Sequence, residues 1–525
     1  MPQSDLNGSW EISSVPEQTS GGAGKGNRNP AIDAAEKSDA SVVPGKLPNK
    51  GKPAEVVEER DAAKGKARGD PTRRTQGRAS VSKGLEGLRE VARCDKRAKF
   101  TALLHHVTPQ LLEQSFHALS KNAAAGVDGV TWREYEERLA QRLPELHRQI
   151  HVGAYRTQPS RRVHIPKPDG SLRPLGIAAL EDKIVQQAVR TVLEAIYEAD
   201  FKGFSYGFRP GRSAHDALDA LWVGIERRNV RSIVDADISA FFDSIDHEWM
   251  MKFLAHRIGD KRVLRLLHKW LQAGHIGEDG RRIPSERGTP QGAVISPLLA
   301  NIYLHYVFDL WAHQWRTRRG GDVIVVRYAD DFVVGLSSQS EAQEMLRAMH
   351  ERFKRFGLRL HPQKTRVIEF GRYAARSRQQ TGLGKPETFD FLGFTHCCGS
   401  NRYGRFKIVR LTARKRMRAT LDALHKELRR RRHHRVADVG QWLRQVLLGY
   451  YQYHAVPDNI RRLTGLRQVV CRLWIQVLRR RSQRHRMPWS RMARLVRQYL
   501  PPPRRLHPYP SQRFDARTQG KSRMR

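Results

Sequence analysis

The stretch Val323 to Gly335, VIVVRYADDFVVG, predicts a β-hairpin with two carboxylates at its turn. β-Branched runs flank a short polar segment that contains Asp330 and Asp331, which is typical of two strands joined by a tight turn. Adjacent carboxylates repel each other and are costly to bury, so we expect a cation to compensate them. Mg²⁺ is the natural candidate, because nucleotidyl-transfer sites hold it with carboxylates and substrate phosphates. An ordinary polar turn is the alternative, since Asp is common in turns.

A third carboxylate in a second β-type run favours the metal interpretation. The segment Ser232 to Phe242, SIVDADISAFF, contains Asp237, and the bulky Phe242 follows five residues later. Two strands side by side would bring Asp237 next to Asp330 and Asp331, although Asp237 and Asp330 are 93 positions (330 − 237) apart in the sequence. The two segments together predict one site that contains all three side chains.

The order of several sequence blocks resembles that of a reverse transcriptase. The upstream blocks further resemble one branch of that family, the group II intron maturases, and the similarity extends from about Leu103 to Phe514. The blocks are IPKPDGSLRPLGI at Ile165 to Ile177, SYGFRPGRSAHDAL at Ser205 to Leu218, DADISAFFDSIDH from Asp235, RGTPQGAVISPLLANIYL at Arg287 to Leu304, YADD at Tyr328 to Asp331, GLRLHPQKT at Gly357 to Thr365 and FLGF at Phe391 to Phe394.

This resemblance implies an α+β right-hand polymerase, with fingers, a palm built on a small antiparallel sheet, and an all-helical thumb and maturase domain. Composition adds a low-complexity N-terminal tail that we expect to be disordered to about Ser82. The expected divisions are the tail at 1–93, the fingers with an N-terminal extension at 94–230, the palm at 231–408, and the thumb and maturase region with a basic tail at 409–525.

The resemblance also implies the metal ligands. Asp237, Asp330 and Asp331, with the backbone carbonyl of Ile238, would hold two Mg²⁺ ions, for which Mn²⁺ is a possible substitute. These three carboxylates would be the catalytic residues.

Five further residues are expected to bind the incoming nucleotide. Lys167 and Arg173 would face the same way across a predicted hairpin and grip a triphosphate, although surface charge on an exposed ribbon is the alternative. The resemblance places Phe242 under the sugar, where its ring would collide with a 2′-hydroxyl. It also places Gln291 beside the nucleotide and Lys364 near the triphosphate.

The charge balance indicates a polyanionic partner. The 525 residues contain 95 Lys and Arg against 53 Asp and Glu, a formal charge of +42, and nucleic acid is the expected partner. A membrane surface is the competing partner, but no apolar run approaches the ~20 residues of a spanning helix. The expected RNA-binding residues are Arg209, Arg212, Arg429, Arg430, Arg431, Arg432, Arg479, Arg480 and Arg481.

Aromatic residues interleave with the basic stretches after about Thr412. Such a composition is typical of surfaces that stack on unpaired bases, although several of these rings are expected to pack between helices instead. The residues are Trp442, Tyr450, Tyr451, Tyr453 and Trp474.

The four cysteines, Cys94, Cys397, Cys398 and Cys471, form no C-x-x-C pair, and we interpret them as reduced thiols of a cytoplasmic protein. The N-terminus also lacks the apolar core of a signal peptide. Many maturases of this resemblance end in an endonuclease domain rich in Cys and His pairs, which we expect to be missing here.

The predicted function is therefore RNA-directed DNA synthesis by a group II intron-encoded protein that also assists splicing. Its partners would be the intron RNA, a DNA target and primer strand, and dNTPs, in a bacterial cytoplasm and at the nucleoid when bound to DNA. Two alternatives stay open: a splicing cofactor that only binds RNA, and a domesticated or defence-type reverse transcriptase. The sequence does not indicate an oligomeric state.

Overall fold

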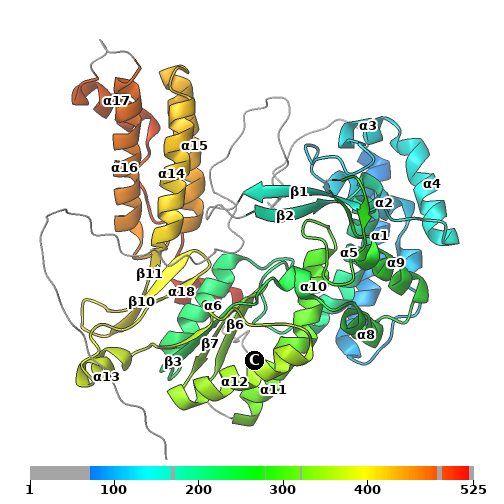
Figure 1. Ribbon diagram of the computed structural model, residues 1–525, viewed down its shortest axis with the longest axis horizontal. Helices are drawn as coiled ribbons and strands as arrows, with labels where there is room; N and C mark the ends of the chain where they lie inside the picture. The colour runs from blue at the N-terminus through cyan, green and yellow to red at the C-terminus, as the bar shows by residue number, and fades with distance from the viewer. Residues whose placement is uncertain (1–70, 167–171, 278, 320–321, 482–486, 519–525) are drawn as a thin grey trace, which may run out of the picture. The chain divides into compact units, whose positions relative to one another are not determined.

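A computed structural model describes residues 71–166, 172–277, 279–319, 322–481 and 487–518, with a mixed α+β arrangement and a helical C-terminal region (Figure 1). Its helices are α1 Pro71–Cys94, η1 Leu104–His106, α2 Pro109–Ala118, α3 Trp132–Glu137, α4 Leu139–Val152, α5 Leu180–Asp200, α6 Ala214–Arg227, α7 Phe241–Ser244, α8 His247–Arg257, α9 Lys261–Gln272, α10 Ser296–Leu304, η2 His305–Asp309, α11 Leu310–Arg319, α12 Gln339–Arg355, α13 Ala374–Gln380, α14 Arg414–Arg430, α15 Val436–His454, α16 Ile460–Arg479, α17 Trp489–Tyr499 and α18 Pro510–Thr518. Its strands are β1 Ser160–Pro166, β2 Leu172–Ile177, β3 Ser232–Ala236, β4 His275–Ile276, β5 Arg282–Ile283, β6 Ile324–Tyr328, β7 Asp331–Leu336, β8 Arg366–Glu369, β9 Phe389–Phe391, β10 Phe394–Ser400 and β11 Phe406–Thr412.

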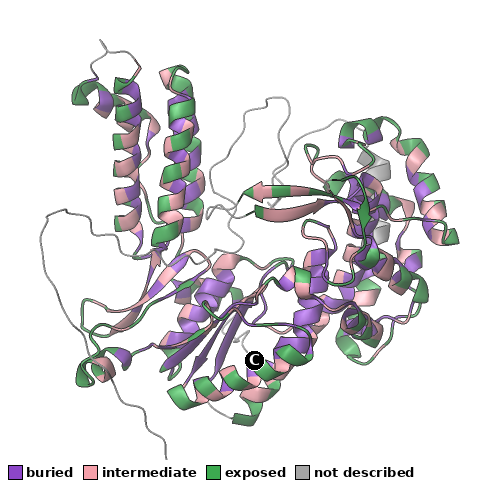
Figure 2. Cartoon of the chain, viewed as in Figure 1, coloured by how far each residue is buried: buried purple, intermediate pink, exposed green. Residues whose placement is uncertain are grey.

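The central sheet has the order β6-β7-β3-β8, and every neighbouring pair is antiparallel. Its strands are short, β-branched and largely buried (Figure 2). Because alternate residues of a strand point to opposite faces, each strand contributes to two apolar clusters. Val234 of β3 packs in the cluster that contains α10 and α12, whereas its neighbour Ile233 packs in the cluster that contains α6. Helices therefore cover both faces of the central sheet, and a functional site is expected at the ends of its strands.

A second sheet has the order β2-β1-β4-β5; β1 and β2 precede the central sheet in the chain, whereas β4 and β5 lie between β3 and β6. β1 pairs antiparallel with β2, with Ile165 opposite Arg173, and this confirms the predicted hairpin. Residues 167–171, which connect the two strands and include Lys167, lie outside the described residues.

The third sheet, β11-β10-β9, leads into the helices α14, α15 and α16, which share an apolar core. Tyr450, Tyr451, Trp442 and Trp474 are all buried in that core. This confirms the expectation that several of the aromatic rings pack between helices, and these four are therefore not available to stack on bases. Only Tyr453, which is partly buried, lies outside this core.

Helix α1 begins at Pro71, within the segment that was expected to be disordered to about Ser82. Leu85 and Ala92 of α1 are buried with residues of α5, and Leu88 packs beside them. Positions 85, 88 and 92 share one face of a helix, so even a short apolar stripe orders the last part of a segment whose composition is polar.

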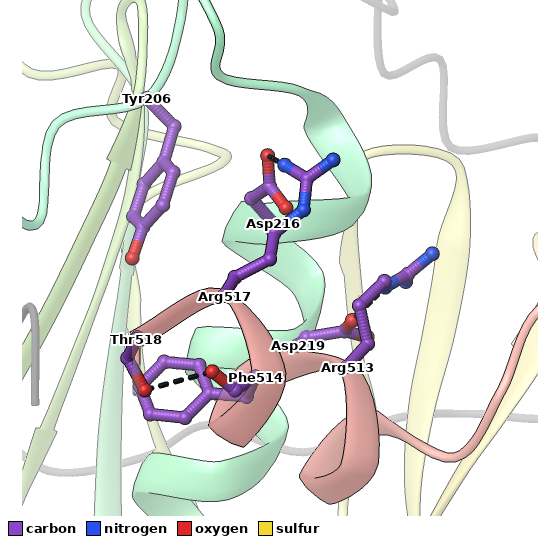
Figure 3. Close-up of a pocket in the computed structure, with 7 residues that line it drawn as sticks. All are labelled: Tyr206, Asp216, Asp219, Arg513, Phe514, Arg517 and Thr518. Carbon is purple, nitrogen blue, oxygen red and sulfur yellow. Dashed lines mark hydrogen bonds and ion pairs between the residues drawn. The ribbon is translucent and has the colours of Figure 1, made fainter. Parts of the chain in front are cut away.

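The C-terminal helix α18 lies against α6 through buried charge (Figure 3). Asp219 of α6 pairs with Arg410 at 2.9 Å and with Arg513, while Asp216 pairs with Arg517. Phe514 of α18 is 8% exposed and belongs to the same apolar cluster as Leu218 and Leu221 of α6.

Among the described residues, no helix has the length and apolar character that crossing a bilayer requires.

Candidate active site

The predicted hairpin is present, and its turn is very tight. Tyr328 at the end of β6 pairs with Asp331 at the start of β7, so Ala329 and Asp330 alone form the turn. Two-residue hairpin turns take positive φ at one or both central positions, which usually favours glycine. Here Ala329 has a φ of +54°, and Asp330 and Asp331 follow it directly.

The predicted neighbour of the hairpin is also confirmed at the level of strands. β3 pairs antiparallel with β7, and Ala236 lies opposite Phe332. Asp237 directly follows Ala236, and Asp331 directly precedes Phe332, so both carboxylates stand at the same end of adjacent strands. Ile238 continues past the sheet and forms a bridge to Leu360.

Lys364 extends the charge pattern at this end of the sheet. Its Nζ lies 3.3 Å from Oδ2 of Asp237, whose side chain is buried. Among the described residues, no three His, Cys, Asp or Glu side chains are close enough together to hold a metal ion. Lys364 therefore supplies a positive charge next to Asp237 at this end of the sheet.

The donor set nevertheless fits Mg²⁺. Asp237 and Asp331 offer hard oxygen ligands from neighbouring strands, and the Ile238 carbonyl follows in the same chain segment. Mg²⁺ needs only one or two protein carboxylates when phosphates and water complete its shell.

A fourth carboxylate, Asp235, lies two residues before Asp237 on β3. The pKa of Asp235 is raised to about 7: burial is the main cause, Arg366, whose Nε lies 3.6 Å from Oδ2, opposes it, and the nearby Asp390 and Asp237 add to it. Asp235 therefore adds a buried carboxylate to β3 next to the predicted metal ligand Asp237.

Two of the expected nucleotide-binding residues contact each other. Nε of Arg173 on β2 donates to Oε1 of Gln291 at 2.9 Å, and the backbone N–H of Gly176 donates to the Gln291 carbonyl at 2.7 Å. The loop before α10 therefore lies on β2, so that a guanidinium and an amide from distant segments form one unit.

Phe242 lies on the helical turn α7 rather than on the expected strand, since β3 ends at Ala236. The backbone N–H of Thr289 donates to the Phe242 carbonyl at 2.8 Å, which ties α7 to the Gln291 loop. Burial raises the pKa of the adjacent Asp243, whereas Arg162 and Arg173 lower it. Asp246 caps α8 through a 3.0 Å bond from the Trp249 N–H.

Sequence reasoning missed the role of Gly207. A Cβ atom at Gly207 would lie 2.3 Å from the backbone nitrogen of Ala329, so only glycine permits this approach to the turn. The sequence offered one indication of this role, a glycine between the aromatic residues Tyr206 and Phe208. The block that contains it was instead interpreted through its arginines, which were predicted to bind RNA.

Two of those arginines have protein partners instead. Arg209 is buried, pairs with Glu198 at 2.8 Å, and donates to the carbonyls of Lys202 and Ser205. Nη1 of Arg212 donates to the Gly203 carbonyl at 2.6 Å. Arg209 is thus buried and bonded to protein groups, which argues against the predicted RNA contact by this residue.

The arginines of the helical region divide in the same way. Arg431 is buried, pairs with Glu427 and lies over the Trp442 ring, so it too is a packing residue. Arg432 and Arg481 are partly buried, and Arg481 donates to the His434 carbonyl. The exposed members of the predicted set are Arg429, Arg430, Arg479 and Arg480.

These features define a polymerase-like site, and comparison with known proteins gives the class. Residues 165–396 match the family described as reverse transcriptase (RNA-dependent DNA polymerase). Protein YkfC of Escherichia coli is 35% identical over 385 residues, which cover 66% of this chain and 96% of YkfC. The chain therefore belongs to the reverse transcriptase family.

A second relative indicates the branch. The group II intron-encoded protein LtrA of Lactococcus lactis is 32% identical over 288 residues, or 52% of this chain. The match spans about half the length of LtrA, 48%. A solved structure of telomerase from Candida albicans, in complex with a fragment of telomeric RNA, is also similar: the match covers 68% of this chain and 67% of the telomerase chain at 14% identity. Its TM-score is 0.37, so this likeness adds nothing to the assignment.

Proposed function

We propose that this chain is a group II intron-encoded reverse transcriptase that copies intron RNA into DNA for retrohoming and assists splicing of that RNA. The pairing of β3 with β7 supports this most directly, because its register brings Asp237 and Asp331 to one end of the sheet. In this proposal residues 94–230 act as fingers, 231–408 as palm, and the helical region from residue 409 as thumb.

In the proposed reaction, a primer 3′-hydroxyl attacks the α-phosphorus of a dNTP in line, and pyrophosphate leaves. Asp237, Asp330, Asp331 and the Ile238 carbonyl would hold two Mg²⁺ ions, or Mn²⁺ in their place. When bound, the metal supplies positive charge to the attacking hydroxyl and the leaving pyrophosphate. The protein therefore needs no nucleophile of its own.

The other residues of the site bind and orient the nucleotide. Arg173, fixed by Gln291 at 2.9 Å, directs a planar guanidinium at the triphosphate. Lys364, 3.3 Å from Asp237, adds a point charge beside the metal ligands. Phe242 is partly exposed on α7 and would exclude a 2′-hydroxyl from the sugar pocket.

The test is primer extension on poly-rA with oligo-dT, dTTP and Mg²⁺. We expect extension by the wild type and none by the Asp330→Ala, Asp331→Ala double variant. The matched control is Asp515→Ala, which removes an exposed carboxylate paired with Arg227 and should leave extension unchanged. Extension by the double variant at the wild-type rate would refute the assignment of these two carboxylates.

A second candidate is a splicing cofactor that binds RNA without copying it. The basic, helical C-terminal region supports RNA binding whether or not the polymerase site is active. The wild type and the Asp330→Ala, Asp331→Ala double variant are therefore compared in splicing of the intron RNA at low Mg²⁺. If neither extends primers but both accelerate splicing equally, the cofactor function replaces the polymerase function.

A further inference from the structure

A buried arginine holds the turn that contains Asp330 from within the protein. Arg327 precedes the turn on β6, and neither its side chain nor that of Asp309 is exposed. Nε and Nη2 of Arg327 donate to the two carboxylate oxygens of Asp309 at 2.7 and 2.6 Å. The pair is thus bidentate and shielded from water, where charge interactions are strongest.

The remaining donors of Arg327 reach the turn and the segments around it. Nη1 donates to the Ala329 carbonyl at 2.9 Å and to Oδ1 of Asn301 at 3.0 Å, and Nη2 also donates to Oγ of Ser205 at 2.7 Å. These bonds use all five donors of a guanidinium. The carbonyl that it binds belongs to the residue with positive φ, so the arginine supports the strained point of the turn.

Further hydrogen bonds connect the same turn to the segment around Gly207. Nδ2 of Asn301 donates to the Gly207 carbonyl at 2.8 Å, and Gly207 is the residue whose missing side chain permits contact with Ala329. The backbone of Arg327 bonds to Phe204 and Tyr206 on either side of Ser205, at 2.9 and 2.8 Å. The turn is therefore fixed from the side chain of Arg327 and from a neighbouring backbone segment.

Asp309 itself occupies an unusual position. It ends η2, a π-helical turn between α10 and α11, and such turns occur frequently at functional sites. His305, at the start of η2, has Nδ1 3.9 Å from Oδ2 of Asp309. Burial lowers the pKa of His305 to about 4, so Arg327 is the cation that balances Asp309 at neutral pH.

We propose that Arg327 and Asp309 are positioning residues for the metal-binding turn. By fixing the Ala329 carbonyl, the pair sets the directions in which Asp330 and Asp331 leave the turn, without touching substrate. The inference rests on the proposed function, because these directions matter only if the carboxylates bind metal. Fold stability alone is a weak reason for the pair, since apolar residues often replace buried ion pairs without loss.

The test compares Asp309→Asn and Arg327→Lys with a matched buried pair elsewhere. Arg257 and Asp200 form an ion pair at 2.9 Å with exposures of 1% and 10%, and Arg257 also donates to backbone carbonyls. The control variant is Asp200→Asn. Three quantities are measured: the Mg²⁺ concentration for half-maximal primer extension, Mn²⁺ binding to the full chain with template–primer by electron paramagnetic resonance, and template–primer affinity.

We expect Asp309→Asn and Arg327→Lys to raise the half-saturating Mg²⁺ concentration about tenfold or more and to weaken Mn²⁺ binding similarly. Their template–primer affinity should stay within about twofold of wild type, because neither residue is exposed to nucleic acid. Asp200→Asn should lower the thermal midpoint and leave both metal measurements unchanged. Arg327→Lys retains a cation beside Asp309, so it decides the question if Asp309→Asn does not fold.

Wild-type metal dependence in both variants would overturn the proposal, as would an equal shift in Asp200→Asn. A failure of the proposed function has a different signature: the wild type would extend no primer, and the Asp330→Ala, Asp331→Ala double variant would bind Mn²⁺ as the wild type does.

Discussion

Phe242 gives the sharpest prediction for a single side chain. If its partly exposed ring excludes the 2′-hydroxyl, Phe242→Val should increase incorporation of rUTP relative to dTTP by roughly one to two orders of magnitude, because a steric clash against the wrong substrate is removed. Single-nucleotide extension with each triphosphate measures this ratio.

The adjacent ring provides the control for that experiment. Phe241 is 2% exposed and packs in the core, so Phe241→Leu should lower the thermal midpoint and leave the sugar preference unchanged. Equal sugar preference in wild type and Phe242→Val would assign discrimination to another residue.

Residues that carry their chemistry in a local pattern could be predicted from the sequence. Asp237 and the Asp330–Asp331 pair stand out because carboxylates interrupt β-branched runs. Arg327 does not stand out, although it directly precedes the same motif. Its partners Asp309, Asn301 and Ser205 are 18, 26 and 122 residues away, and only the folded chain brings them together.

At the scale of elements, His396 predicts how the third sheet responds to acid. The ring is buried on β10 and stacks on Phe389, with ring centroids 4.8 Å apart. Burial, together with Arg410, lowers the pKa of His396 from 6.5 to about 3. Between these values the unfolded chain binds the proton and the folded chain does not, so stability falls as the pH drops below 6.5.

We therefore expect His396→Phe to reduce the loss of unfolding free energy between pH 7 and pH 5 by about 2 kcal/mol. Denaturant unfolding at the two pH values measures this difference. His433→Phe, at an exposed position after α14, is the control and should retain the wild-type pH dependence. An unchanged pH dependence in His396→Phe would show that the pKa of this ring is the same in the folded and the unfolded chain.

The contact between α18 and α6 gives a second element-level prediction. Asp219→Asn leaves Arg410 and Arg513 without their buried counter-charge and should cost about 3 kcal/mol, as when one partner of a buried pair is removed. Asp515→Asn breaks the exposed pair with Arg227 on the same two helices and should cost less than about 1 kcal/mol. Denaturant unfolding compares the two, and equal losses would contradict the role of burial.

Elements with sustained periodicity were predicted well, and those with weak or mixed signals were not. Ile184, Ala188, Val192 and Ile196 recur at helical spacing in the sequence, and all four are buried on α5, Leu180–Asp200. The short apolar segment Leu358 to His361 contributes only the bridge from Leu360 to Ile238. The π-helical turn η2 could not be predicted from the sequence, because one extra residue within a helix barely alters the spacing of apolar residues over so short a segment.

For the whole molecule, the charge of +42 predicts strongly salt-dependent RNA binding. The affinity for structured RNA should fall by about 10³-fold between 50 and 200 mM salt, because phosphate contacts release counterions. Filter binding over a salt series measures the slope. The double variant Arg429→Gln, Arg430→Gln should reduce that slope, whereas Arg133→Gln, Arg347→Gln, at exposed positions on α3 and α12, should not. If the two double variants show the same salt dependence, the helical region is not part of the RNA interface.

The ion pair of Asp219 also bears on how the chain is made. This carboxylate is 1% exposed in the finished protein, yet Arg410 and Arg513 follow it by 191 and 294 residues. At 5–20 residues per second, about 10–40 s pass before even the first arginine is synthesised. Until then α6 cannot bury the face that contains Asp219 without leaving its charge unpaired. The core around α6 therefore forms only after the later segments are synthesised, and chaperones can bind the exposed face during that time.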